Sequence, residues 1–464
     1  MSAKKGIHFE VSERKILLRL IDILFVFLGL YLLELCFDFD YITIASENTL
    51  QLIVLIVYLS VFGTIFELYD LLQASKIDVT FKNVVLTASL TVLTYLLTPV
   101  ITPFLPENRL QIIYLYFAVI VMIFLWRVAY ITFIQSPRFY KRVLLVGEIS
   151  NIDQIVNALN VADPNYKIIG FINAESEADE AVKFKGLKEF NSEKLLEVIQ
   201  GERISEILVA SLNPETITPD VYHNLISLLE KGFTIREYTQ VYEELTYRVP
   251  IQFVGKDFYK YFPFSRSNQN KLYLFFHRLF DIVFSVLGLA FGLVISPIII
   301  LGNLVGNKGS LLYMQHRIGK HGKQFNIIKL RTMVKNAEQN GAKWAEKNDS
   351  RVTAFGKFLR RSRLDEIPQF INVLKGDMSI IGPRPERPFF VNELSRIIPF
   401  YETRHIVKPG LTGWAQVKTR YGSSVEDSLT KLQYDLYYIK HRSVFLDLNI
   451  FVKTLSTILY YRGQ

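Results

Sequence analysis

Four long apolar runs in the first third of the chain limit most strongly what this sequence can fold into. They cover about residues 16–37, 50–68, 84–101 and 110–134. Each run is close to the ~20 residues that an α-helix needs to cross the hydrocarbon core of a bilayer. Half of all residues are hydrophobic, yet 21% are charged, so the chain combines membrane-embedded and water-exposed parts. The sequence therefore predicts a four-helix transmembrane bundle over residues 1–137.

The charges in the loops orient this bundle. The loop after the first run is acidic, with Asp38, Asp40 and Glu47, whereas Lys76 and Lys82 follow the second run and three basic residues follow the fourth. By the positive-inside rule, both ends of the bundle face the cytoplasm. The first run is not followed by a small-residue cleavage site, so we interpret it as an anchor and not as a removed signal.

Three residues within the apolar runs need a separate interpretation. Asp22 and Arg127 lie within or at the ends of two runs. Intramembrane charge can be functional, but the alternative is that both residues lie near the interface or pair inside the bundle. The only cysteine is Cys36, which excludes an intrachain disulfide and a zinc site built from cysteines.

Residues 138–248 alternate between strand-like and helix-like segments. Strand patterns cover residues 141–147, 167–172, 204–210 and 233–236, and helical spacing covers residues 152–159 and 221–231. This alternation predicts a Rossmann-like α/β domain with a parallel sheet. The turn after the first strand, at residues 147–151, lacks the glycine pattern that approaches a pyrophosphate, which disfavours dinucleotide binding. We expect a regulatory or assembly module.

A fifth apolar segment follows a connector at residues 249–273. This segment, residues 278–305, is long enough to span a bilayer but carries Ser296-Pro297 near its middle. Proline removes one helical hydrogen bond, so we expect a kink, with Ser296 helping to satisfy a freed carbonyl. Both flanks are basic, which places both ends in the cytoplasm. The sequence therefore predicts a re-entrant membrane helix; the alternative is an ordinary spanning helix with a kink.

The most concentrated chemistry lies in residues 360–369, where arginines precede two adjacent carboxylates. The arginines include Arg360 and Arg363, and the carboxylates are Asp365 and Glu366. Carboxylates attract Mg²⁺ and arginines attract phosphate, so one short segment addresses both halves of a metal–phosphate substrate. The alternative is a solvated helix start with local ion pairs.

Further cations accumulate around this segment. Residues 306–364 hold fourteen Lys or Arg against three acids, which predicts a polyanionic partner: nucleic acid, anionic lipid headgroups or a nucleotide substrate. A strand pattern at residues 325–333 presents Lys329 and Arg331 on one face as a candidate phosphate clamp; the alternative is a snorkelling edge at the membrane surface. Prolines on both sides hold Arg384 in a rigid turn.

Seven pieces follow one another in a fixed order in the last part of the chain. They are the apolar segment with Ser296-Pro297, KLRTM at 329–333, LDEIPQ at 364–369, NVLKGDMS at 372–379, GPRP at 382–385, KPGLTGWAQ at 408–416 and DLYYI at 435–439. In this order they resemble the bacterial sugar transferase family, the monotopic phosphoglycosyltransferases. The upstream regions resemble its large members, which add a four-helix membrane bundle and a Rossmann-like cytoplasmic domain. The resemblance implies a mainly α-helical catalytic domain over residues 274–464 that includes the re-entrant helix.

The resemblance also implies a reaction. A hexose-1-phosphate, glucose or galactose by default, is transferred from a UDP-sugar to undecaprenyl phosphate with release of UMP, which starts the synthesis of exopolysaccharide, capsule or O-antigen. The family forms a covalent intermediate, and its nucleophile matches Asp365. Glu366 would hold Mg²⁺. A carboxylate can attack a phosphoryl group when nearby cations neutralise the charge of the substrate.

The same resemblance assigns the other candidate residues. Arg360 matches the family's phosphate-binding arginine, and Asp435 matches an acidic position near the site. Lys329, Arg331 and Arg384 are expected to be weaker phosphate or nucleotide contacts. Many relatives have small residues around Ser362, where this chain carries the additional arginines Arg361 and Arg363.

The implied setting is the bacterial inner membrane, with a multi-pass protein and its catalytic domain on the cytoplasmic face. The implied partners are a UDP-sugar, undecaprenyl phosphate and membrane lipids but no nucleic acid, and a homodimer is plausible. Two other functions stay open: a non-catalytic membrane scaffold of polysaccharide assembly, and a nucleotide-dependent sugar-modifying oxidoreductase or epimerase that uses the Rossmann-like region.

Overall fold

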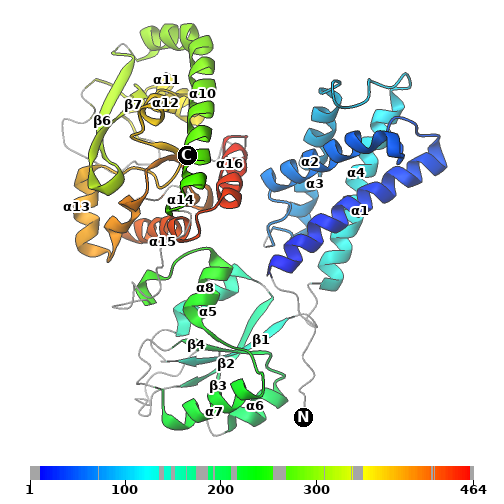
Figure 1. The fold of residues 1–464 in the computed structure, drawn as a ribbon, viewed down its shortest axis with the longest axis vertical. Coiled ribbons are helices and arrows are strands. Elements are labelled where there is room, and N and C mark those ends of the chain that lie inside the picture. Colours follow the sequence, from blue (N-terminus) through cyan, green and yellow to red (C-terminus); the bar gives the residue numbers. More distant parts are fainter. Residues whose placement is uncertain are drawn as a thin grey trace. The chain divides into compact units, whose positions relative to one another are not determined.

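The computed structural model divides the chain into two compact units, Met1–Thr246 (unit 1) and Tyr247–Gln464 (unit 2). The structure describes residues 11–71, 73–134, 140–147, 152–163, 165–173, 187–191, 194–210, 217–253, 268–307, 309–335, 337, 349–419, 422 and 424–459. Unit 1 holds a helical bundle and an α/β domain, and unit 2 holds a long apolar helix and the region of the sequence motifs (Figure 1).

Four long helices build the first part of unit 1. They are α1 (Val11–Phe37), α2 (Thr49–Ile65), α3 (Ile77–Leu96) and α4 (Leu110–Ala129), the last continued by a π-helical turn at Tyr130–Ile134. Helix α4 packs against α1 and α3, and α2 packs against α3. Leu55 and Leu115 are buried between the helices, whereas Leu24 and Phe117 remain exposed. All four helices are long and apolar enough to cross a membrane, as the sequence predicts.

Helix α3 lies earlier in the chain than the apolar run at residues 84–101. It begins at Ile77, because the helix continues upstream through polar residues, and an acid such as Asp78 is favourable in a first turn. It ends at Leu96, because Pro99 lacks an N–H and disfavours helical geometry at the residue before it. The predicted helix exists, but both of its predicted ends were too late in the sequence.

Asp22 on α1 and Arg127 on α4 form an ion pair inside the bundle. Oδ2 of Asp22 and Nη2 of Arg127 lie 2.5 Å apart, and both side chains are fully buried. The Arg127 guanidinium also lies over the Tyr69 ring, 5.6 Å from its centroid. A buried ion needs such partners, because an isolated charge is strongly disfavoured away from water. Pairing within the bundle is therefore the interpretation that the structure supports.

A five-stranded parallel sheet forms the second part of unit 1. Its strands, in the spatial order β3-β2-β1-β4-β5, are β1 (Lys141–Gly147), β2 (Tyr166–Asn173), β3 (Lys188–Glu189), β4 (Glu206–Ala210) and β5 (Ile235–Glu237). Its helices are α5 (Ile152–Ala162), α6 (Leu195–Gly201), α7 (Pro219–Glu230) and α8 (Tyr238–Thr246). The predicted parallel α/β domain is confirmed. Most of the turn at residues 147–151 lies outside the described residues.

Unit 2 contains α10 (Lys271–Gly306), a helix of 36 residues that is also long and apolar enough to cross a membrane. Pro297 lies inside it, and Figure 1 shows the helix changing direction towards its C-terminal end. Pro297 cannot donate to the carbonyl of Leu293, and the Ser296 hydroxyl donates to that oxygen instead, at 2.8 Å. Ser296 therefore plays the local role that its position next to the proline predicts.

Helix α10 lies directly against α12 (Gln369–Lys375), the helix that follows the carboxylate pair. Two glycines permit this approach. A Cβ atom at Gly288 would lie 2.3 Å from the Phe370 ring, and one at Gly292 would lie 2.7 Å from Ile367 Cγ2. Because Ile367 directly follows Glu366, the packing of α10 helps to fix the position of the carboxylates.

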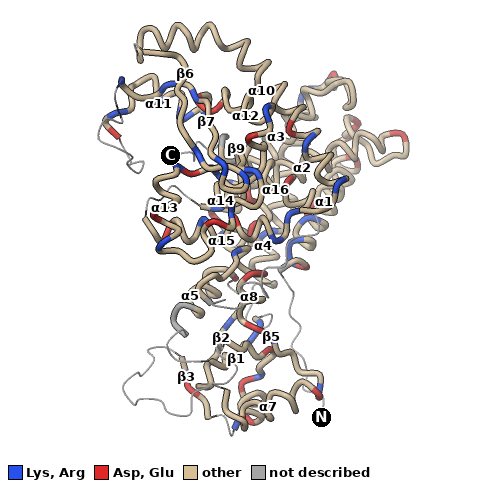
Figure 2. The backbone as a smooth tube through the Cα atoms, turned by 60° about the vertical axis from the view of Figure 1, so that its left-hand side comes forward, with Lys and Arg blue, Asp and Glu red and all other residues tan. Residues whose placement is uncertain are grey.

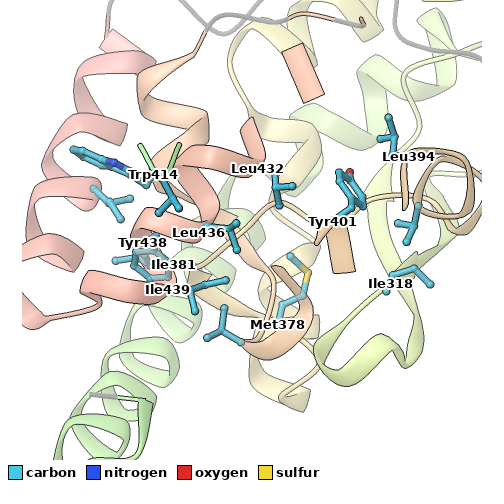
Figure 3. Packing of buried hydrophobic residues seen from close by; sticks show 14 of the residues in the cluster. Ile318, Met378, Ile381, Leu394, Tyr401, Trp414, Leu432, Leu436, Tyr438 and Ile439 are labelled. Atoms are coloured by element: carbon cyan, nitrogen blue, oxygen red, sulfur yellow. The ribbon is translucent and has the colours of Figure 1, made fainter. Parts of the chain in front are cut away.

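Most of the remaining elements of unit 2 surround a large hydrophobic core, and a second, smaller cluster contains Ile299, Leu330 and Leu359. The strands are the antiparallel pair β6 (Leu312–Ile318) and β7 (Gln324–Leu330) and the parallel pair β8 (Ser379–Ile381) and β9 (Gly410–Thr412). The helices besides α10 and α12 are α11 (Ala354–Arg361), α13 (Pro388–Ile397), α14 (Trp414–Lys418), α15 (Val425–His441) and α16 (Val444–Leu459). Met378, Trp414 and Leu436 belong to the core (Figure 3). Val249 and Ile251, from the predicted connector, also lie in it.

Candidate active site

Asp365 and Glu366 lie in a short 3₁₀ turn, Leu364–Glu366, between α11 and α12. Arg363 leads into this turn with a left-handed backbone (φ 59°), a conformation that few residues other than glycine adopt readily. Only 7% of Asp365 and 9% of Glu366 is exposed. The two carboxylates therefore occupy a tight break between two helices and not a solvated helix start.

Three cations converge on one oxygen of Glu366. Arg384 Nη2 donates a hydrogen bond of 2.7 Å to Glu366 Oε1, and Arg363 Nη1 and Lys329 Nζ lie 3.6 and 3.8 Å from the same atom. Burial by itself raises the pKa of Glu366, but the charges of Arg384, Lys329 and Arg363 outweigh burial and lower the pKa to about 2. Glu366 is therefore ionised at any physiological pH.

Asp365 has a different environment from its neighbour. Its Oδ1 atom is buried and accepts no hydrogen bond from any residue that the structure describes. Burial and the adjacent charge of Glu366 raise the pKa of Asp365 to about 6, against the opposing charges of Lys329 and Arg360. Asp365 is therefore ionised at neutral pH and retains an oxygen with no hydrogen bond, as a carboxylate nucleophile requires.

The remaining predicted cations have distinct partners. Lys329 on β7 reaches the carboxylate pair, whereas Arg331, one residue beyond the strand, donates from Nη2 to Ser310 Oγ at 2.7 Å. Arg360 on α11 donates from Nε to Thr332 Oγ1 at 3.0 Å, which fixes its side chain beside the KLRTM segment. Figure 2 shows Lys and Arg positions along α11, β6 and β7, in the basic part of the chain.

Asp435 on α15 acts on this region through Arg404. Arg404 Nη2 donates to Asp435 Oδ2 at 2.7 Å and to the backbone carbonyl of Arg384 at 3.0 Å, and the side chains of Arg404 and Asp435 are both buried. Burial raises the pKa of Asp435 to about 6, despite the opposing charge of Arg404. Asp435 therefore supports the turn that carries Arg384.

The structure adds Arg404 to the candidate site residues and shows that Arg363, one of the arginines before the carboxylates, contacts Glu366. Arg363 stands two residues before Asp365, so its place in the sequence was a usable signal, although its left-handed backbone was not. Arg404 meets the carbonyl of Arg384 across a separation of 20 residues. No recognisable sequence pattern links an arginine to a backbone carbonyl 20 residues earlier in the chain.

A magnesium ion at the carboxylate pair would need a substrate to complete its coordination. Within the described ranges, no group of three or more His, Cys, Asp and Glu side chains could hold a metal ion. Mg²⁺ in phosphate sites commonly takes one or two carboxylates and fills its other positions with phosphate oxygens and water. Glu366 is ionised and could supply such an oxygen, and the buried Oδ1 of Asp365 marks the adjoining position as polar.

Helices of membrane-crossing length and a buried carboxylate pair within a set of cations define a membrane-associated protein with a candidate phosphate-binding site. Residues 272–461 match the family model described as bacterial sugar transferase. The chain is 42% identical over 223 residues to the UDP-N-acetylgalactosamine-undecaprenyl-phosphate N-acetylgalactosaminephosphotransferase of Aeromonas hydrophila, covering 47% of this chain and 51% of the relative.

Two further relatives carry glucose in their names. The UDP-glucose:undecaprenyl-phosphate glucose-1-phosphate transferase of Xanthomonas campestris is 43% identical over 164 residues, 35% of this chain and 34% of the relative. The transferase of the same name from Caulobacter vibrioides is 37% identical over 187 residues, 39% of this chain and 69% of the relative. The chain thus spans about half of the Aeromonas relative and a third of the Xanthomonas one. It belongs to the bacterial sugar transferase family.

Proposed function

We propose that this protein transfers a sugar-1-phosphate from a UDP-linked hexose to undecaprenyl phosphate and releases UMP. The observation that carries the proposal is the contrast between two adjacent buried carboxylates: three cations converge on Oε1 of Glu366, whereas Oδ1 of Asp365 accepts no hydrogen bond within the described residues. Such a contrast assigns different chemical roles to the two groups. The names of the relatives support the donor and acceptor classes.

The transfer runs in two displacements. First, a carboxylate oxygen of Asp365 attacks the phosphorus that carries the sugar, the bond from this phosphorus to the bridging oxygen breaks, and UMP leaves with that oxygen. Second, a phosphate oxygen of undecaprenyl phosphate attacks the same phosphorus. The acyl phosphate bond then breaks and the Asp365 carboxylate is restored, so that one site serves a soluble donor and a lipid acceptor.

The cations around the pair neutralise the charge that both displacements bring together. Lys329 and Arg384 lie beside Glu366. The positive charge of Arg360 acts on Asp365. Fixed cations of this kind stabilise the transition state of phosphoryl transfer. Glu366 would hold Mg²⁺, which when bound supplies further charge neutralisation to the diphosphate.

The proposed setting is the cytoplasmic face of the bacterial inner membrane. Helix α10 would enter and leave the same leaflet around its Pro297 kink, because basic residues flank both of its ends. A re-entrant α10 brings the carboxylates, which pack against it through Ile367, close to the headgroups. A lipid-linked acceptor presents its phosphate at the same depth.

UMP release tests this function directly. Full-length protein in nanodiscs that contain undecaprenyl phosphate is incubated with Mg²⁺ and UDP-glucose, UDP-galactose or UDP-N-acetylgalactosamine. At least one donor should release UMP and yield a lipid-linked sugar, and Arg396→Ala, an exposed change on α13, should behave like the unmodified protein. If none of the three donors releases UMP, the proposal is contradicted.

A further inference from the structure

A second cationic site lies in unit 2, in a cavity of about 660 Å³ beside the N-terminal part of α10. Leu274, Arg278 and Asp281 line it from α10, at the helical spacing that places them on one face. Lys320, in the short turn Lys320–Gly322 (η10), and Lys408, which precedes β9, line it from other elements. The volume is within the range of cavities that bind small organic groups.

The charge in this cavity is strongly positive. Four permanent cations face one carboxylate: the cations are Arg278, Lys320, Lys408 and Arg442, and the carboxylate is Asp281. Oδ1 of Asp281 already accepts from Ser379 Oγ and from the backbone N–H of Ile380, each at 2.8 Å. Asp281 can offset at most one of the four cations, so the cavity retains an excess of positive charge that favours an anion.

Lys408 is the cation that is best placed to bind a ligand. Among the described residues its Nζ atom makes no hydrogen bond and no ion pair, whereas both terminal nitrogens of Arg278 donate to backbone carbonyls. Burial and the nearby charges of Arg278 and Lys320 lower the pKa of Lys408, and the opposing charges of Asp281 and Asp377 only partly compensate for them. A bound anion would supply the remaining compensation.

This cavity is separate from the carboxylate site. Arg278 donates to the carbonyls of Val373 and Leu374, at 2.6 and 2.7 Å, in the last turn of α12. Asp365 and Glu366 precede the first turn of the same helix, which has seven residues and is therefore about 10 Å long. Neither carboxylate lines the cavity.

The surroundings of the cavity point to a lipid. The same part of α10 exposes large apolar side chains, among them Leu272 at 67%, Phe275 at 63% and Phe276 at 55%. An apolar helix surface next to a cationic cavity matches the two halves of a phospholipid, whose acyl chains need apolar contact and whose phosphate needs positive charge.

We propose that this cavity binds the phosphate headgroup of an anionic membrane phospholipid, with the acyl chains lying along the exposed apolar residues of α10. The site requires only that α10 lies in the membrane and is independent of the proposed transfer reaction. It gives unit 2 a specific lipid contact, which fixes the height and orientation of α10 relative to the headgroups.

Native mass spectrometry of full-length protein, purified in equal amounts of phosphatidylglycerol and phosphatidylcholine, tests this inference. The unmodified protein should retain phosphatidylglycerol selectively. The Lys320→Ala and Lys408→Ala changes should each weaken retention about fivefold, the effect of one surface lysine on anionic lipid binding. Lys408→Arg should retain the lipid, as should Lys323→Ala, a matched control on an exposed lysine that does not line the cavity.

Two outcomes would overturn the inference. Equal phosphatidylglycerol retention by the unmodified protein and the Lys320→Ala/Lys408→Ala double variant would show that the cavity holds no lipid. Lysine-dependent binding of soluble glycerol phosphate, without selective retention of phosphatidylglycerol, would show that the ligand is a soluble phosphate ester. The readout is lipid mass and not turnover, so a failure here leaves the transfer reaction unaffected.

Discussion

Arg384 donates a hydrogen bond of 2.7 Å from Nη2 to Oε1 of Glu366, and this contact separates the two adjacent carboxylates chemically. The positive charge of Arg384 holds Glu366 in its ionised form. The resulting negative charge on Glu366, together with burial, raises the pKa of Asp365. One carboxylate is thus a permanent anion and the other has a pKa of about 6, a contrast that fits the proposed roles of metal ligand and nucleophile.

Arg384→Ala should lower kcat/KM about 10²-fold or more, because it removes a fixed cation from the place where phosphate charge accumulates. Arg384→Lys should recover part of this loss, since a lysine restores the charge but not the geometry of the guanidinium. UMP release measures both effects. A kcat/KM value for Arg384→Ala within threefold of that of the unmodified protein would show that Arg384 does not contribute to catalysis at this site.

The pH profile of the reaction should report Asp365. Because burial and Glu366 raise its pKa to about 6, Asp365 is protonated, and cannot attack, below that pH. We expect kcat/KM to fall tenfold per pH unit below about pH 6 and to level off above it. Steady-state rates between pH 4.5 and 8.5 check this, and a rate that stays constant down to pH 4.5 would rule out this assignment.

Asp365→Asn should stabilise the protein at neutral pH. The folded chain holds a proton on Asp365 up to about pH 6, whereas the unfolded chain releases it near 3.8, so stability falls as pH rises through this window. Asparagine avoids that loss, which amounts to about 3 kcal/mol. Thermal unfolding should show a higher Tm for the variant at pH 7.5 and a smaller difference at pH 4.5; equal Tm values at pH 7.5 would contradict the account.

Asp435→Asn should reduce activity without abolishing it. The change leaves the buried Arg404 without its counter-ion, and Arg404 holds the carbonyl of Arg384. We expect kcat/KM to fall about tenfold and stability to fall by about 3 kcal/mol, as for other broken buried pairs. If Asp435 instead contacted the reacting atoms, its replacement would abolish UMP release altogether.

The sequence predicted the architecture well, because the signals that set it are local. Apolar length marks the long helices, and strand–helix alternation marks the parallel sheet. Ser296 next to Pro297 also predicted a hydrogen bond that the structure contains, since the freed carbonyl of Leu293 lies within reach of that hydroxyl. The ends of α3 were harder to predict from the sequence, because polar residues can continue a helix beyond its apolar part.

The sequence indicated which residues form the candidate site better than it indicated the contacts between them. Lys329 and Arg331 alternate along a strand pattern, but β7 ends at Leu330, so only Lys329 keeps the strand geometry that directs it to Glu366. The support of Arg384 by Arg404 depends on the tertiary packing of the turn Tyr401–Ile406, which carries Arg404, against α15 and against the turn that carries Arg384. No local sequence pattern contains that information.

Trapping of the covalent intermediate tests the central claim most directly. Full-length protein is incubated with Mg²⁺ and the active UDP-sugar in the absence of a lipid acceptor, and its intact mass is measured. The account predicts a mass increase of one sugar phosphate per chain, located on the peptide that contains Asp365 and absent from Asp365→Asn. A UMP-releasing protein that carries no adduct, or an adduct that persists in Asp365→Asn, would contradict it.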